Sequence, residues 1–134
     1  IDQSMGVKWH QYVQCGYKGA FDVAKEVGVV PPPVPRGLNL LVHGRVPAGA
    51  GVSSSSALTV ASILAVTHAY GIDAKLSRAA IGEAARKCEL YIGTMSGGMD
   101  QAISCLAEAG KAARIDFDPL VVRASPSPPP RHLR

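Results

Sequence analysis

The glycine- and serine-rich segment at residues 47–57, PAGAGVSSSSA, contains residues that could bind a phosphate group. Glycines let the backbone adopt positive φ and let a bulky anion approach without meeting a Cβ atom. If the apolar stretch that follows is a helix, its first N–H groups are unpaired and its dipole presents a positive end to the segment. Serine hydroxyls can donate to phosphate oxygens or bind Mg²⁺, a hard cation that prefers oxygen. The segment is therefore a candidate nucleotide-phosphate site.

Two other interpretations of this segment are weaker. A flexible Gly/Ser linker has the same composition, but a linker would not normally lie between a hydrophobic strand and an apolar helix, which is what the flanking sequence predicts. The phosphate loop G-x-x-x-x-G-K-[ST] does not fit, because Gly51 is followed by Val52 rather than by a lysine.

Two acidic residues, Glu89 and Asp100, flank a second glycine-rich turn at residues 93–98. Phosphoryl transfer needs one acid that helps to hold the metal bridging the phosphates and another that accepts or orients the proton of the attacking hydroxyl. The turn would fold one helix end beside the next, so the two acids could converge. The alternatives are that Glu89 is a solvated helix residue and that Asp100 is an early-turn acid favourable to its helix dipole.

Both segments resemble motifs of the GHMP kinase superfamily. PAGAGVSSSSA looks like its second motif, P-x-x-x-G-L-S-S-S-A, with Val52 in place of the usual leucine. GTMSGGMDQAIS, at residues 93–104, looks like the galactokinase stretch that ends in [CG]-G-x-M-D-Q. The resemblance covers about residues 9–120. Its E-x-Y-I-G-T-x-S-G-G-M-D-Q form, at residues 89–101, is more similar to the N-acetylgalactosamine kinase and plant galactokinase branch than to the bacterial galactokinases.

This resemblance implies ATP-dependent phosphorylation of galactose, or of N-acetylgalactosamine, at the anomeric hydroxyl, with ATP and Mg²⁺ as cofactors. It implies Asp100 as the catalytic base beside the sugar, Gly97 as a sugar contact and Glu89 as a Mg²⁺ ligand. Ser55 is the preferred second Mg²⁺ ligand, with Ser54 as the alternative. The residues expected to bind the ATP phosphates are Gly49, Ala50, Gly51, Val52, Ser53, Ser54 and Ser55.

Two elements of the family pattern are absent from the sequence: a sugar-recognition stretch like G-R-V-N-L-I-G-E-H, which carries an arginine, and a glycine-rich third motif. Because phosphoryl transfer depends on positioning and charge stabilisation, we expect a fragment that is inactive or feeble by itself. The remainder of the kinase fold, or a partner chain, would supply the other half of the cleft. The alternative from another class is a non-catalytic sugar- or nucleotide-binding module that serves as a sensor.

Apolar periodicity predicts four helices that would position these residues. Apolar residues recur at intervals of three and four over about residues 5–27, where Trp9 is expected to pack in the core. The apolar stretch at residues 57–70 places the phosphate-binding segment at the start of a helix. Two further helices are expected after Ser77, a suitable N-cap, and near Met99.

Two short runs, residues 38–46 and 111–117, predict strands. The mixture predicts an α/β (α+β) fold with a mixed sheet packed by helices. The resemblance implies a partial GHMP-kinase N-terminal domain, similar to ribosomal protein S5 domain 2, over residues 1–120. A proline-rich tail at residues 121–134 is expected to be disordered, because its composition cannot bury enough apolar surface to offset the entropy of ordering.

Composition favours a single globular domain. The chain has 134 residues, of which 47% are hydrophobic and 18% charged, enough for one core. A net charge of +4 suits an anionic ligand. Tail arginines account for part of this excess, and no basic stripe is interleaved with aromatic residues, so nucleic acid is not an expected partner.

The cysteines, Cys15, Cys88 and Cys105, are odd in number and far apart, without the spacing of a zinc site. We expect each to be a reduced, buried small hydrophobe in a cytoplasmic protein. The sequence shows no evident targeting or membrane segment, so a membrane is not an expected partner.

Overall fold

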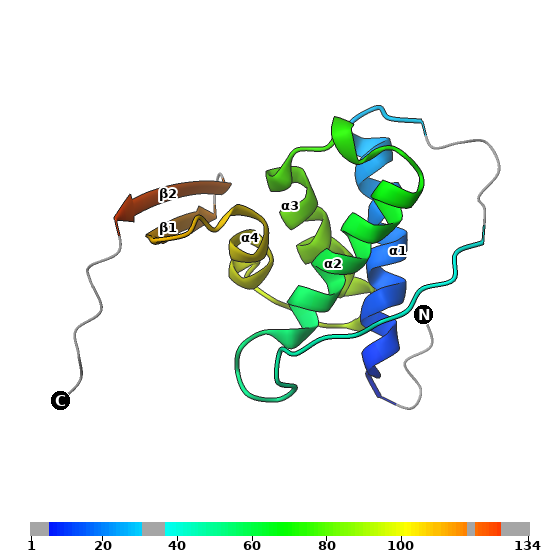
Figure 1. Ribbon diagram of the computed structural model, residues 1–134, viewed down its shortest axis with the longest axis horizontal. Helices are drawn as coiled ribbons and strands as arrows, with labels where there is room; N and C mark the ends of the chain where they lie inside the picture. Colours follow the sequence, from blue (N-terminus) through cyan, green and yellow to red (C-terminus); the bar gives the residue numbers. More distant parts are fainter. Residues whose placement is uncertain (1–5, 31–36, 118–119, 127–134) are drawn as a thin grey trace.

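The computed structural model describes residues 6–30, 37–117 and 120–126. Within these residues the chain forms four α-helices, two short 3₁₀ helices and one two-stranded sheet (Figure 1). The α-helices are α1 (Trp9–Glu26), α2 (Ser54–Ala69), α3 (Arg78–Glu89) and α4 (Met99–Leu106). The 3₁₀ helices are η1 (Asp73–Lys75) and η2 (Leu90–Ile92), and the strands are β1 (Lys111–Phe117) and β2 (Leu120–Pro126).

The four helices expected from the sequence are confirmed. The residue at which α2 begins bears on the candidate site. α2 begins at Ser54 rather than at residue 57, so three serines of the glycine- and serine-rich segment, Ser54, Ser55 and Ser56, lie in its first turn. Ser77 caps α3 as expected, because its Oγ accepts a hydrogen bond from the backbone N–H of Ala80 at 3.1 Å.

The core lies where α1, α2 and α3 meet. On α1, a Cβ atom added to Gly16 would lie 2.4 Å from the Cβ of Ser62 and 2.8 Å from the carbonyl oxygen of Thr59, both on α2. Glycine at this position therefore lets the two helix backbones approach closely. Buried residues of the core include Cys15, Ala20, Val23, Val60, Ile63, Val66, Ala85 and Cys88.

The expectation that Trp9 packs in the core is wrong. Its side chain is 63% exposed. Trp9 is the first residue of α1, before the buried face of that helix begins at Gln11, and its ring instead makes an edge contact with His10. Trp9 thus lies at the end of the helix, where the spacing of apolar residues is a poor guide to burial.

The three cysteines are free and buried, which confirms their interpretation as small hydrophobes. Burial raises the pKa of Cys15 to about 11, and the nearby Glu89 carboxylate acts in the same direction. A thiol of this kind is held in its neutral, unreactive form at neutral pH.

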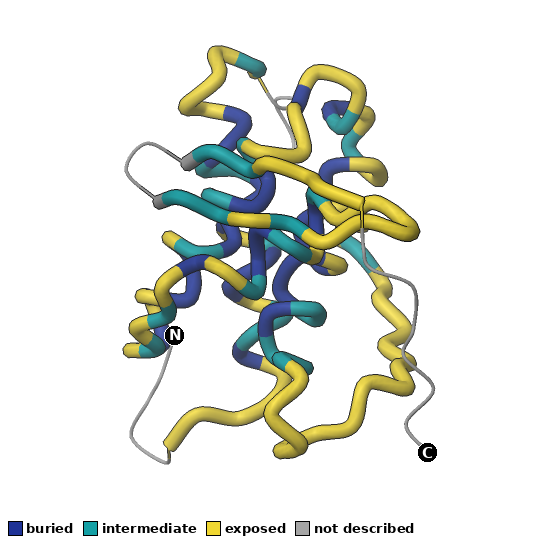
Figure 2. The backbone as a smooth tube through the Cα atoms, turned by 90° about the vertical axis from the view of Figure 1, so that its left-hand side faces the viewer, coloured by how far each residue is buried: buried dark blue, intermediate teal, exposed yellow. Residues whose placement is uncertain are grey.

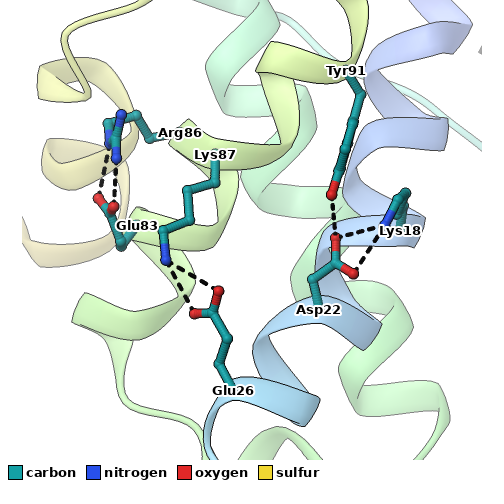
Figure 3. Close-up of polar contacts among 7 residues, drawn as sticks. All are labelled: Lys18, Asp22, Glu26, Glu83, Arg86, Lys87 and Tyr91. Atoms are coloured by element: carbon teal, nitrogen blue, oxygen red, sulfur yellow. Dashed lines mark hydrogen bonds and ion pairs between the residues drawn. The ribbon is translucent and has the colours of Figure 1, made fainter.

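Polar contacts join α1 to α3 and η2 on the outside of the core (Figure 3). Lys87 lies 3.1 Å from Glu26, and the hydroxyl of Tyr91 donates to Asp22 at 3.0 Å. The ammonium of Lys18 lies 4.4 Å from the centre of the Tyr91 ring. Exposed ion pairs each contribute only about 0–1 kcal/mol to stability. Packing in the core must therefore fix the position of α3 against α1, and these contacts add a smaller stabilisation.

The sheet differs from the expected mixed sheet. β1 and β2 form an antiparallel hairpin, in which Lys111 lies opposite Pro126 and Phe117 opposite Leu120. Figure 1 shows this hairpin beside α4, away from α1. The strand expected at 111–117 is confirmed. The mixed sheet is wrong for the described residues, because the hairpin is their only sheet.

The expected start of a disordered tail at residue 121 is also wrong, since β2 continues to Pro126. Pairing with β1 satisfies the backbone polar groups of this segment, and Asp116 of β1 lies 3.4 Å from Arg123 of β2. Local composition did not reveal this partner. Residues 127–134 of the expected tail lie outside the described residues.

Residues 38–46, expected to form a strand, have no strand structure. The segment is not paired with another strand among the residues that the structure describes, although it contains apolar residues such as Leu41, which is 98% exposed. Strand formation requires a hydrogen-bonded neighbour, so an apolar run by itself does not produce one. Figure 2 shows the contrast between the buried positions of the helices and the exposed backbone that leads into α2.

Candidate active site

The glycine- and serine-rich segment at residues 47–57 has an unusual backbone where it enters α2. Gly49 and Gly51 both have φ of 71°, and Ser53 has φ of 55° and ψ of 47°. Ser53 is the one described non-glycine residue with a positive φ. A left-handed serine is strained, and such strain is concentrated at ligand-binding sites.

The first turn of α2 can accept an anion. Ser53 occupies the N-cap position but its side chain makes no capping hydrogen bond, so it does not satisfy the N–H groups of that turn. Residues 49–52 are exposed, and a Cβ placed on Gly49 or Gly51 would meet no described atom within 4 Å. The two glycines are therefore needed for their backbone conformation, and the segment is open to a bulky ligand.

Glu89, the last residue of α3, is buried, with 1% of its surface exposed. The interpretation of Glu89 as a solvated helix residue is therefore wrong. Neither of its carboxylate oxygens has a hydrogen-bond partner among the described residues. Burial raises the pKa of Glu89, while the side chains of Gln101, Thr59 and Ser56 act to lower it.

These neighbours show where the carboxylate lies. Ser56 and Thr59 belong to the first turns of α2, and Gln101 belongs to α4, so Glu89 lies where three helices meet, behind the start of α2. All three neighbours are buried, with exposed fractions of 2%, 0% and 0%. The hydroxyl of Thr59 is already used within α2, where it donates to the carbonyl of Ser55 at 3.1 Å.

Three buried oxygens in this region lack a hydrogen-bond partner among the described residues: both carboxylate oxygens of Glu89 and Oε1 of Gln101. An unpaired buried carboxylate is costly, and a hard divalent cation with oxygen ligands would offset that cost. No described cluster of three or more His, Cys, Asp or Glu residues could hold a metal. This set of donors fits Mg²⁺, which usually takes one or two carboxylates and completes its coordination with phosphate and water.

Asp100 lies in the first turn of α4, is half-buried, and follows the N-cap Gly98, which has φ of 88°. Its charge is the smallest of the causes that act on the pKa of Glu89, and it raises that pKa. Its position in the first turn also favours the helix dipole, so the alternative role applies as well. Gly97, which precedes this N-cap, is exposed.

The structure thus brings together the start of α2, Glu89 and Asp100. Sequence reasoning missed Ser56, Thr59 and Gln101. Ser56, rather than its neighbour Ser55, is the serine that acts on the Glu89 carboxyl. The signal available in the sequence was the placement of Ser56 and Thr59 three positions apart in an otherwise apolar stretch, which puts both on one helix face.

No helix among the described residues has both the length and the apolar character needed to span a membrane.

Comparison with known proteins identifies the family of this chain. The family model for the N-terminal domain of GHMP kinases matches residues 11–108. Galactokinases from Dictyostelium discoideum and Candida parapsilosis are 40% and 39% identical over 111 residues, which are 83% of this chain and 21% of each relative. A galactokinase from Schizosaccharomyces pombe is 42% identical over 84 residues, 63% of this chain and 16% of the relative.

The chain therefore spans about a fifth of the length of the first two relatives. The family model nevertheless covers both halves of the site, from the first turn of α2 through Asp100. On this evidence the chain belongs to the GHMP kinases, as a galactokinase-like member.

Proposed function

We propose that this chain supplies the ATP-phosphate loop and the catalytic aspartate of a sugar kinase that phosphorylates galactose, or N-acetylgalactosamine, at the anomeric hydroxyl. The observation that carries the proposal is the buried, unpartnered carboxylate of Glu89 behind the start of α2 and near Asp100. The names of the relatives support the sugar and the reaction. The two-stranded hairpin beside the helices is compatible with the ribosomal protein S5 domain 2-like fold, which we propose for the complete domain.

ATP would bind with its phosphates at residues 49–55. The positive φ of Gly49 and Gly51 turns the backbone around the anion, and the uncapped N–H groups of α2 donate to it. Ser55 and Glu89 would hold Mg²⁺. The ion, when bound, supplies charge neutralisation at the phosphate oxygens.

Asp100 would act as the base. Its carboxylate accepts or orients the proton of the anomeric hydroxyl as that oxygen attacks the terminal phosphorus in line. Gly97 would lie against the sugar, where the lack of a Cβ lets the ring approach the backbone.

Calorimetric titration with a non-hydrolysable ATP analogue and Mg²⁺ tests the binding half of the proposal. We expect saturable binding that weakens by roughly 10- to 100-fold in Ser55→Ala and in Glu89→Ala, since hydrogen bonds and ligation by charged groups are worth about 1.5–3 kcal/mol. Ala79→Ser, at an exposed position of α3, is the matched control and should bind as the unchanged chain does. No binding by a folded chain would overturn the proposal.

A chimaera tests the catalytic half. The 111 matched residues of the Dictyostelium galactokinase would be replaced by those of this chain, so that the relative supplies the remaining elements. We expect phosphorylation of galactose or N-acetylgalactosamine, abolished by Asp100→Ala. A chimaera that binds ATP and sugar but transfers no phosphate would instead favour the sensor-like, non-catalytic function.

A further inference from the structure

Gln101 occupies an unusual position for an amide. Its side chain is fully buried on α4, with 0% exposed. Its Nε2 donates to Oγ of Ser96 at 2.8 Å, whereas its Oε1 has no hydrogen-bond partner among the described residues. A buried amide that is only half satisfied needs an explanation, because an apolar side chain of similar size would fill the same space without an unpaired polar atom.

The amide lies between two parts of the site. Ser96 belongs to the turn between η2 and α4, one residue before Gly97. Glu89 is also buried near this amide: of the side chains that lower the pKa of its carboxyl, Gln101 has the largest effect, although neither carboxylate oxygen accepts a hydrogen bond among the described residues. A primary amide carries two N–H donors, so one can hold Ser96 while the other faces the carboxylate.

We propose that Gln101 is a positioning residue that orients the Glu89 carboxylate toward a divalent cation at the start of α2 and ties it to the turn that carries Gly97. The inference rests on the proposed role of Glu89 as a cation ligand. Carboxylates that ligate metals are themselves held by hydrogen bonds, and loss of such a partner typically weakens metal binding about 10- to 100-fold.

The shared amide has a second consequence. Because the amide that bonds Ser96 would also orient Glu89 once a cation is present, binding of the cation and ordering of the turn would be coupled, and the coupling would act equally in both directions. Cation and nucleotide at the start of α2 would therefore prepare the turn that faces the sugar. This coupling distinguishes a positioning role from simple core packing.

The test uses Mn²⁺ as the probe, titrated in the presence of the non-hydrolysable ATP analogue and followed by electron paramagnetic resonance. Gln101→Met keeps the length of the side chain and removes its hydrogen bonds. We expect its Mn²⁺ affinity to fall about 10- to 100-fold, while affinity for the analogue without metal stays unchanged. Ser96→Ala, which leaves the amide free to face Glu89, should retain Mn²⁺ affinity within about threefold of the unchanged chain.

Hydrogen exchange measures the coupling. In the unchanged chain, Mg²⁺ and the analogue should slow exchange at residues 93–98. Both Gln101→Met and Ser96→Ala should lose this response, although only the first loses metal affinity. A variant that merely disturbed packing would change exchange with and without the cation alike.

The outcomes separate the inference from the function on which it rests. If Glu89→Ala loses Mn²⁺ and Gln101→Met binds it normally, the positioning role is wrong and the proposed function stands. If Glu89→Ala binds Mn²⁺ normally, the proposed function and the inference both fail. If Gln101→Met does not fold by circular dichroism, Gln101→Asn replaces it; its amide is one methylene too short to reach both groups, and normal Mn²⁺ binding there would equally overturn the inference.

Discussion

At the scale of single residues, the site is an arrangement of groups that the protein itself leaves unsatisfied. Glu89 is buried without a hydrogen-bond partner among the described residues, and Ser53 adopts a left-handed conformation without capping the helix that follows it. Each feature costs stability in the absence of a ligand. The uncapped helix start could bind an anion, and the unpartnered carboxylate could bind a cation.

Glu89 gives a pH dependence of stability whose sign is fixed by its burial. An unfolded glutamate has a pKa near 4.5, and burial raises that value in the folded chain. The folded chain therefore binds the proton more tightly, so this contribution to stability is complete below the unfolded pKa and is lost as pH rises through the folded pKa. Glu89→Gln should remove the loss and leave the metal-free chain more stable at neutral pH.

Thermal unfolding of both chains from about pH 4 to pH 8 measures the effect, since 1 kcal/mol corresponds to roughly 4–8 °C for a domain of about this size. The difference between the two melting temperatures cancels the other titrating groups. The difference should grow with pH. A difference that stays flat or shrinks would mean that Glu89 is not buried as an uncompensated carboxyl.

At the scale of elements, alanine substitution of the two serines at helix starts should have different effects on the stability of the chain. Ser77 caps α3 through the N–H of Ala80, whereas Ser53 makes no capping bond to α2. Ser77→Ala should lower the free energy of unfolding by about 1 kcal/mol, and Ser53→Ala should change it by less than about 0.5 kcal/mol. Urea unfolding measures both. Equal losses would show that Ser53 caps its helix after all.

The close crossing of α1 and α2 depends on Gly16. An alanine there would place its Cβ 2.4 Å from Ser62 and 2.8 Å from a backbone oxygen that cannot rotate away. We expect Gly16→Ala to destabilise the chain by roughly 1–3 kcal/mol through overpacking. The control is Gly44→Ala, where the new Cβ would meet no described atom within 4 Å and the melting temperature should hold or rise slightly.

The helices could be predicted because their signals are local: periodicity identified α1 and α3, and Ser77 identified the start of α3. Strands depend on partners that no local pattern names. The apolar run at 38–46 therefore suggested a strand that does not form, and β2 was placed in the expected tail, although the alternation at 111–117 did identify β1. The surroundings of Glu89 were missed for the same reason, because Ser56 and Gln101 approach it from separate helices.

At the scale of the whole molecule, apolar surface stays uncovered. α2 has no clear separation of polar and apolar faces, and its Leu64 is 44% exposed. Leu40, Leu41 and Val42, from the segment that precedes α2, line a shallow groove of 170 Å³ together with Leu58 and Ala65 of α2. An exposed apolar surface next to an unpaired extended segment favours association with another chain.

We therefore expect the isolated chain to self-associate through this surface. Sedimentation velocity at rising protein concentration should show species larger than a monomer, and the double change Leu41→Lys and Leu64→Lys should shift the distribution toward the monomer. Charge on an apolar patch opposes its burial, because each lysine would have to lose its hydration. Ala79→Lys adds the same charge at an exposed position of α3 and should leave the association unchanged. A chain that stays monomeric and melts sharply at every concentration would show that this surface is stable in water, and the rest of a kinase domain would then not be needed to cover it.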